Sequence, residues 1–242
     1  MIILFTVLVF PSFGITQSSA NAGPFFEVYR VHPYLSITQE AINEVHTLSE
    51  LNPHFKASWI KDYISVKVLT IHDGKTRTST GKSETLTREQ KNNLLNADVD
   101  QEVSVKVLYI PENNLKQNDP KEMDFTFVFI PENEANFPKG KGPLKNYLKK
   151  TAIDKIEPGV FVGYNLAAVK FTLNKEGEIF NVHLFESSTD KKTDELLLKA
   201  IQNMPCWEPA EYANGQETNQ EFVLTVGNME NCMVNLLNIR QD

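Results

Sequence analysis

Cysteine and histidine, the residues that most often hold metals or redox groups, are scarce in this sequence. The 242 residues include two cysteines, Cys206 and Cys232, and five histidines that are scattered along the chain. No two of these residues have the spacing of zinc ligands, and no Cys-x-x-Cys motif occurs. We therefore expect neither a metal centre nor a cofactor.

The sequence also lacks the motifs that mark common active sites. It contains no Gly-x-Ser-x-Gly elbow, no His-Glu-x-x-His helix and no glycine-rich phosphate loop. Asp190 and Asp194 flank a predicted helix start, where the helix dipole alone favours carboxylates. Glu112 and Glu132 each follow a strand-ending proline, and nothing in the sequence places them together as an acid–base pair. His183 has no nearby nucleophile, so we predict that the protein is not an enzyme.

Positive charge is in deficit, with 24 basic residues against 31 acidic residues and a net charge of −7. No basic stripe with interleaved aromatic residues appears, so a nucleic-acid partner is not expected. Apolar residues make up 41% of the chain and charged residues 23%, as is usual for folded globular proteins. A chain of this length forms one large domain or two small ones.

The apolar run at the start of the chain, Ile2–Phe10, is shorter than the ~20 residues that a membrane-spanning helix needs. No Lys or Arg precedes this run, and no cysteine follows it directly as in a lipoprotein. Ala20-Asn21-Ala22 fits the small-x-small rule for signal-peptide cleavage. We predict that residues 1–22 are a signal peptide that exports the protein. An uncleaved anchor, which would bring membrane contact, is the alternative.

Export would bring the two cysteines into an oxidising compartment, in which disulfides form. A bond between Cys206 and Cys232 would stabilise the protein by about 3 kcal/mol according to the loop-entropy estimate. Two buried thiols that never meet are the alternative, and the sequence favours neither.

The carboxyl-terminal half contains two runs that alternate as half-buried strands do. Leu166–Asn174 and Glu178–Glu186 each place apolar residues at every second position, and Gly177 between them suits a tight turn. In the second run the residues that share one side of the predicted strand are Phe180, Val182 and Leu184. These features predict a β-hairpin.

A helix and a last strand follow this hairpin. Thr193 is the predicted N-cap of the helix, because a hydroxyl can accept a hydrogen bond from the first turn. Pro205 ends the helix, and Pro209 keeps the next segment from continuing it. Glu221–Val226 is the final β-prone run.

The string Met204-Pro205-Cys206-Trp207-Glu208-Pro209-Ala210 is the most specific part of a family resemblance. Together with Val169-Lys170-Phe171, Gly177 and Val182 it resembles the TonB C-terminal domain, in the variant common among Bacteroidetes. Upstream, Asn136-Phe137-Pro138-Lys139-Gly140 resembles the segment that opens this domain. The resemblance implies an α+β fold whose carboxyl-terminal domain is a two-layer ββαβ unit with an antiparallel sheet.

Four residues have structural roles in this interpretation: Gly177, Pro205, Trp207 and Pro209. A large ring directly after the helix stop would close the open end of the core between helix and sheet. We therefore predict that Trp207 is buried and that its role is structural.

In this family the last strand lies at an edge of the sheet, where main-chain groups are unpaired and a partner segment can add a strand by β-augmentation. The resemblance therefore implies a periplasmic protein whose partner, in energy-coupled transport, is an outer-membrane TonB-dependent receptor or another envelope protein. The docking residues would be Gln220, Glu221, Phe222, Val223, Leu224, Thr225 and Val226. Alternatively, the upstream domain or Cys232–Leu237 covers this strand.

One feature of TonB itself does not occur here, namely the long proline-rich span that crosses the periplasm. The twelve prolines of this sequence are dispersed along the chain. The resemblance thus supports the fold more strongly than energy transduction. A non-transducing structural or scaffold module of the cell envelope is the alternative function.

Residues 23–133 are predicted to form a small β-rich domain with short helices. Its predicted strands are Tyr63–Ile71, Glu102–Ile110 and Phe125–Ile130. Asp73-Gly74 is a hairpin turn signal. Leu86-Thr87-Arg88-Glu89-Gln90 contains a capping box and resembles a helix start in the periplasmic modules of the gliding-motility protein GldM. Pro131–Pro143 is the predicted boundary to the second domain, residues 134–242.

Overall fold

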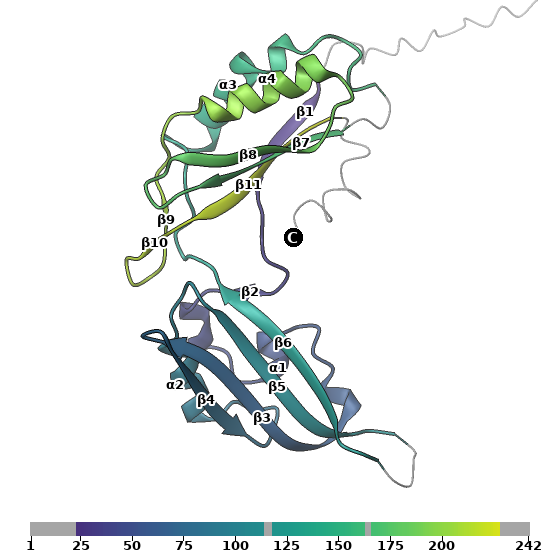
Figure 1. Cartoon of the computed structure of the whole chain (residues 1–242), viewed down its shortest axis with the longest axis vertical. Helices are drawn as coiled ribbons and strands as arrows, with labels where there is room; N and C mark the ends of the chain where they lie inside the picture. Colours follow the sequence, from purple (N-terminus) through teal and green to yellow (C-terminus); the bar gives the residue numbers. More distant parts are fainter. Residues whose placement is uncertain (1–22, 114–117, 163–165, 228–242) are drawn as a thin grey trace, which may run out of the picture.

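The computed structural model describes residues 23–113, 118–162 and 166–227, and the structural statements below refer to these. The predicted signal peptide and Cys232 lie outside the described residues. The protein is α+β, as predicted, with two larger, mainly antiparallel sheets, one small two-stranded sheet and few helices (Figure 1). Among the described residues, no helix combines the length and the apolar character that crossing a membrane would require.

A five-stranded sheet in the order β2-β6-β5-β3-β4 forms the lower unit in Figure 1. Its strands are β2 (Ser36–Ile37), β3 (Ile60–His72), β4 (Lys75–Gly81), β5 (Glu102–Pro111) and β6 (Lys121–Phe129). Its helical segments are η1 (Glu40–Asn43), α1 (Leu48–Leu51), η2 (Ala57–Trp59) and α2 (Arg88–Leu95). Leu48 of α1 and Leu94 of α2 share one buried core with Val66, Val105 and Phe127 of the sheet.

The local signals of this unit are confirmed. The predicted strands Tyr63–Ile71 and Glu102–Ile110 lie within β3 and β5, and Phe125–Ile130 overlaps the end of β6 but runs one residue beyond it. Asp73 and Gly74 turn the chain between β3 and β4 with positive φ angles of 49° and 68°, as a two-residue hairpin turn requires. Thr87 caps α2, because its Oγ1 accepts from the Gln90 N–H at 3.2 Å and Gln90 Oε1 accepts from the Thr87 N–H at 2.8 Å.

A four-stranded sheet in the order β1-β11-β7-β8 forms the upper unit, with α3 and α4 over one face (Figure 1). Its strands are β1 (Phe25–Arg30), β7 (Leu166–Leu173), β8 (Ile179–Glu186) and β11 (Gln220–Gly227), beside a small hairpin of β9 (Ala210–Glu211) and β10 (Glu217–Thr218). Its helical segments are α3 (Lys141–Thr151), η3 (Ile153–Lys155) and α4 (Lys191–Gln202). Phe171, Leu173 and Leu224 pack with Leu197 and Ile201 of α4 in the core.

Strand β8 departs from the predicted alternation. Its register against β7 is interrupted in two places, one of which leaves two residues of β8 opposite Phe171. Asn181 has a φ of 51° at this bulge. As a result Val182 and Leu184 pack against the core, while Phe180 points away and is 43% exposed. The prediction that Phe180 shares a side with these two residues is wrong, because a bulge shifts the alternation by one residue.

The predicted domain boundary is wrong for the start of the chain. Residues 25–30 were assigned to the first domain, yet β1 pairs antiparallel with β11 along its whole length, from Phe25 opposite Gly227 to Arg30 opposite Phe222. The reason is that β11 is apolar and buried, so its second row of main-chain groups needs a partner, and β1 supplies it. The chain then crosses to the lower unit, which is inserted between β1 and the remainder of the upper unit.

Side chains and main-chain bonds hold the two units together. Tyr212, after β9, is buried in the core of the lower unit, and its hydroxyl donates to the Phe129 carbonyl at 3.5 Å. Ala213 N–H donates to the Glu132 carboxylate at 2.7 Å. The predicted boundary segment is itself paired, because Asn133 and Asn136 form isolated bridges with Glu211 and Glu208. The units are therefore coupled and do not merely share a linker.

Candidate partner-binding site

The strand predicted to dock a partner is not an edge of the sheet. β11 lies between β1 and β7, and every residue from Gln220 to Gly227 is opposite a residue of β7. The prediction of a free edge at Gln220–Val226 is therefore wrong. β1 covers β11. This is close to the first of the two alternatives, because the sequence assigns residues 25–30 to the upstream domain, although they belong to the upper sheet. Cys232–Leu237, the other alternative, lies outside the described residues.

The four residues predicted to be structural lie around the end of α4 and the β7–β8 turn. Gly177 has a φ of 77°, and a Cβ atom built on it would lie 1.9 Å from the Trp207 carbonyl oxygen. Trp207 N–H donates to the Gly177 carbonyl at 2.9 Å. Pro205 follows the last helical residue, Gln202, by three positions, and Pro209 precedes β9 directly. At position 177 only glycine allows the main chain to approach that of Trp207 this closely.

Trp207 is 6% exposed and lies at the centre of an aromatic cluster. Its ring centroid lies 5.4 Å from that of Phe137, 6.1 Å from that of Phe171 and 5.3 Å from that of Phe222. Its Nε1–H is buried and makes no hydrogen bond to any described residue. Cys206, next to it, is exposed, and its thiol contacts the Glu176 carbonyl oxygen at 3.1 Å. The alternative of two buried thiols is therefore wrong for Cys206, whereas the other alternative, a disulfide with Cys232, involves a residue outside the described chain.

Acidic side chains at the start of α4 support the helix. The N-cap is Asp190 and not Thr193 as predicted, because the Asp190 carboxylate accepts from the Thr193 N–H at 2.9 Å and from its hydroxyl at 2.6 Å. These two donors favour the charged form and lower the pKa of Asp190. The Asp194 carboxylate accepts from Ser188 N–H at 2.8 Å and from Ser187 Oγ at 2.6 Å. Asp190 thus caps α4, and Asp194 holds the segment that precedes the helix.

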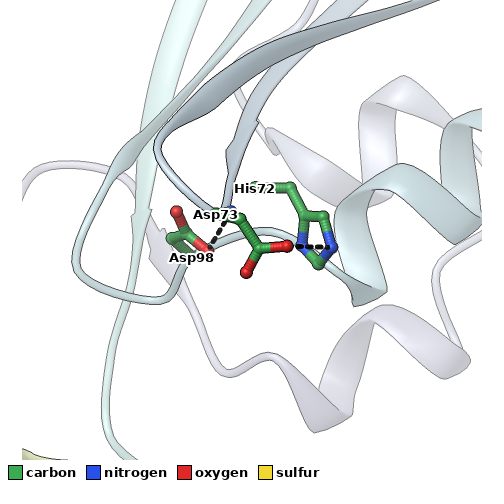
Figure 2. Close-up of side chains that lie close together, drawn as sticks. All are labelled: His72, Asp73 and Asp98. Atoms are coloured by element: carbon green, nitrogen blue, oxygen red, sulfur yellow. Dashed lines mark hydrogen bonds and ion pairs between the residues drawn. The ribbon is translucent and has the colours of Figure 1, made fainter.

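His72, Asp73 and Asp98 form the one group of three metal-ligating side chains found close together among the described residues (Figure 2). The Asp98 carboxylate accepts from the main-chain N–H groups of Asp73 and Gly74, both at 3.1 Å. His72 Nε2 lies 3.4 Å from an Asp73 oxygen, and its Nδ1 contacts the Asn96 carbonyl. These bonds clamp the β3–β4 turn, so the group has a structural explanation without a metal.

An open cavity of about 560 Å³ lies between the segment His32–Ile37 and the region of α1. Tyr34 stacks on His54 there, with ring centroids 5.5 Å apart. The Glu50 carboxylate at the cavity accepts from His46 N–H at 2.5 Å and from Thr47 N–H at 3.2 Å. The first of these bonds lowers the pKa of Glu50. The Glu50 side chain thus completes the capping box of α1.

The two outer strands of the four-stranded sheet, β8 and β1, differ in how well they could accept another strand. β8 is bulged twice, a device that discourages edge pairing. β1 is paired in continuous register. Val31 N–H donates to the Glu221 carbonyl at 2.9 Å. Because bonding direction alternates along an antiparallel strand, the main-chain groups of Phe26, Val28 and Arg30 point to the outer side of β1. No strand of the described chain pairs with that side.

A second cavity, of about 100 Å³, borders this outer side and lies between β1, α3 and the segment before α3. Its apolar lining comes from Phe26, Val28, Phe137, Leu144, Leu148, Trp207 and Phe222. Two ion pairs stand at its rim: Arg30 with Glu134 at 2.6 Å and Lys145 with Glu27 at 2.7 Å. A regular strand edge and an apolar hole beside it therefore form one continuous surface, here called the β1 edge site.

Helix α3 adds positive charge to the β1 edge site. Lys141 and Lys145 line the cavity, and Lys149 continues the same stripe at a spacing of four residues. The helix contains no acidic residue. Positive charge at the first residue of a helix opposes the helix dipole, so helix stability does not account for Lys141. The stripe stands out in a chain of net charge −7.

Comparison of the chain with protein families, with curated proteins and with solved structures finds no match. The β1 edge site was missed by sequence reasoning, although two signals for it are visible. Phe25–Arg30 is a short β-prone run, and the lysines of 141–150 have no acidic neighbours. Neither signal by itself shows that the two segments lie side by side.

Proposed function

We propose that this protein is an exported protein-binding module of the cell envelope, which holds an extended segment of a partner at the outer edge of β1. The observation that carries the proposal is the unbulged, outward-facing row of main-chain groups on Phe26, Val28 and Arg30, next to an apolar cavity. The succession β7, β8, α4, β11 supports the resemblance to TonB C-terminal domains. That resemblance supports export and a partner in the envelope.

The energetics of strand addition fit a reversible interaction. The three outward residues offer three N–H and three C=O groups, and each hydrogen bond contributes a net ~0.5–1.5 kcal/mol. One apolar side chain buried in the cavity adds about 1.5–3 kcal/mol. Lost freedom of motion and the ordering of the peptide offset a large part of this gain. Dissociation constants in the micromolar range are therefore expected.

A second candidate function is a non-transducing scaffold. It is favoured by one observation: β1 of the same chain already occupies the edge of β11, where the resemblance would place a receptor. In this alternative the upper unit fixes the lower unit through Tyr212 and Glu132 and binds no peptide. The two functions differ in whether the β1 edge site binds extended peptides.

The test uses the protein purified after export, a displayed library of short random peptides and a proline variant. Val28→Pro removes an outward N–H but leaves the bonds between β1 and β11 in place, because proline is tolerated at the free side of an edge strand. Val28→Thr keeps the N–H and a branched side chain, and serves as the matched control. We expect the library to yield peptides that shift the amide resonances of Phe26, Val28 and Arg30. We expect Val28→Pro, checked for an unchanged thermal midpoint, to lose the binding of these peptides.

Two results would overturn the proposal. One is a library that yields no binder under conditions where a control protein does. The other is a set of binders whose shifts map away from β1 and whose affinity is the same for both variants. Either result would favour the scaffold.

A further inference from the structure

Resting on the proposed function, we infer that the partner segment is acidic and that it places one branched apolar side chain in the cavity beside β1. The inference joins two features of the β1 edge site: the size of the cavity and the charge of α3.

The cavity sets the size of the anchor. Its volume is about 100 Å³, somewhat less than the ~150 Å³ of an engineered cavity that binds benzene. A valine or leucine side chain fits this space, whereas an aromatic ring would need the walls to move. The walls are apolar rings and aliphatic chains, and Phe26 and Val28 belong to the same strand that would pair with the peptide. Side chains of a paired strand alternate, so one residue of the peptide would enter while its neighbours point outward.

Trp207 lies against the cavity and can report on its occupation. The residue is one of those that line the cavity, and its Nε1–H is buried, without a partner among the described residues. A side chain that enters the cavity would therefore change the apolar surroundings of Trp207, and the donor itself is not part of the proposed contact.

Charge complementarity selects an acidic segment. The two acidic residues at the rim, Glu27 and Glu134, are each within 2.7 Å of a cationic side chain. Lys141, which lines the cavity, and Lys149, two turns further along α3, then leave this helix with excess positive charge. Complementary charge of this kind raises the association rate and excludes basic partners. The positive charge of α3 also disfavours a second copy of this chain as the occupant of the site. Symmetric pairing of two β1 edges would bring the lysines of two α3 helices together.

The two tryptophans of the chain provide a direct assay. Trp59 is 61% exposed on the other unit, whereas Trp207 lines the cavity. In a Trp59→Phe variant of the full protein, the fluorescence of Trp207 therefore reports on the cavity alone. The probes are three synthetic peptides: one that alternates Asp or Glu with Val around a central Leu, one with Lys in place of the acids, and one with Ser in place of the Leu.

We expect the acidic peptide to change the Trp207 emission in a saturable way and to bind more weakly as salt rises, since salt screens exposed charges. The Lys peptide should not bind. The Ser peptide should bind at least about tenfold more weakly, which is the effect of losing one buried leucine. Lys141→Glu combined with Lys149→Glu should weaken the acidic peptide about tenfold or more. Lys199→Glu, a single charge reversal of the same kind on exposed α4, should leave its affinity unchanged.

The outcomes separate this inference from the function on which it rests. Equal binding of the acidic and the Lys peptide, with loss of both in Val28→Pro, would overturn the acidic preference but leave strand addition intact. Equal binding of the Leu and Ser peptides would overturn the anchor. The absence of any peptide binding at β1 would overturn both proposals, as would a concentration-dependent dimer that occupies β1 and excludes peptides.

Discussion

Gly177→Ala should destabilise the protein far more than the same substitution at another glycine of positive φ. Gly177 lies in the β7–β8 turn with a φ of 77°. A Cβ atom there would lie 1.9 Å from the Trp207 carbonyl oxygen and 2.9 Å from the Trp207 carbonyl carbon. Both contacts are with main-chain atoms, so no rotation of a side chain relieves them.

The magnitude follows from three losses. Alanine in the left-handed region costs about 1–2 kcal/mol. Moving the two chains apart breaks the hydrogen bond from Trp207 N–H to the Gly177 carbonyl, at a cost of about 1 kcal/mol. The displaced Trp207 ring disturbs the aromatic core, which adds about 1–2 kcal/mol, as overpacking does elsewhere. The free energy of unfolding should therefore fall by about 3–5 kcal/mol.

Urea unfolding of Gly177→Ala and Gly215→Ala measures this difference. Gly215 has a φ of 83°, but a Cβ atom there meets nothing within 4 Å. Its substitution carries only the conformational cost of about 1–2 kcal/mol. Equal losses in the two variants would refute the argument, because they would mean that the approach of Trp207 to Gly177 contributes nothing.

Three other predictions concern the core, the hairpin clamp and one tyrosine. Trp207→Ala should cost on the order of 3 kcal/mol by large-to-small core logic, and coinciding thermal melts of variant and parent would contradict a structural role. Asp98→Ala removes the acceptor of two turn N–H groups, so hydrogen exchange at Asp73 and Gly74 should speed up; unchanged exchange would contradict the clamp. Burial raises the pKa of Tyr63 to about 12, above the ~10 of an unfolded chain. Its contribution to stability is therefore complete below pH ~10 and is lost as pH rises toward 12. Urea midpoints should fall over that range less in Tyr63→Phe than in the parent, and an equal fall in both would exclude Tyr63 as the cause.

Features that depend on neighbouring residues could be predicted from the sequence. The Asp73-Gly74 turn and the capping box of Thr87 are set by the conformational preferences of a few consecutive residues. The core side of β7 follows from alternation alone, because the strand lies inside the sheet and has no bulge of its own to shift its faces.

Features that depend on distant segments could not be predicted. Nothing in Phe25–Arg30 tells which sheet it joins, since its partner β11 lies nearly two hundred residues away and any apolar edge would serve. The bulge of β8 at Asn181 has no sequence signal of the kind that Gly177 gives for its turn. Both misses bear on the site, because the pairing of β1 closes the expected edge and opens another.

Residue-resolved amide hydrogen exchange of the protein, with and without the acidic peptide, tests the central claim most directly. The account predicts that the β11 amides are protected in the free protein, while those of Phe26, Val28 and Arg30 exchange quickly and become protected when the peptide binds. Fast exchange along β11, or protection of the three β1 amides that is already complete without peptide, would contradict it.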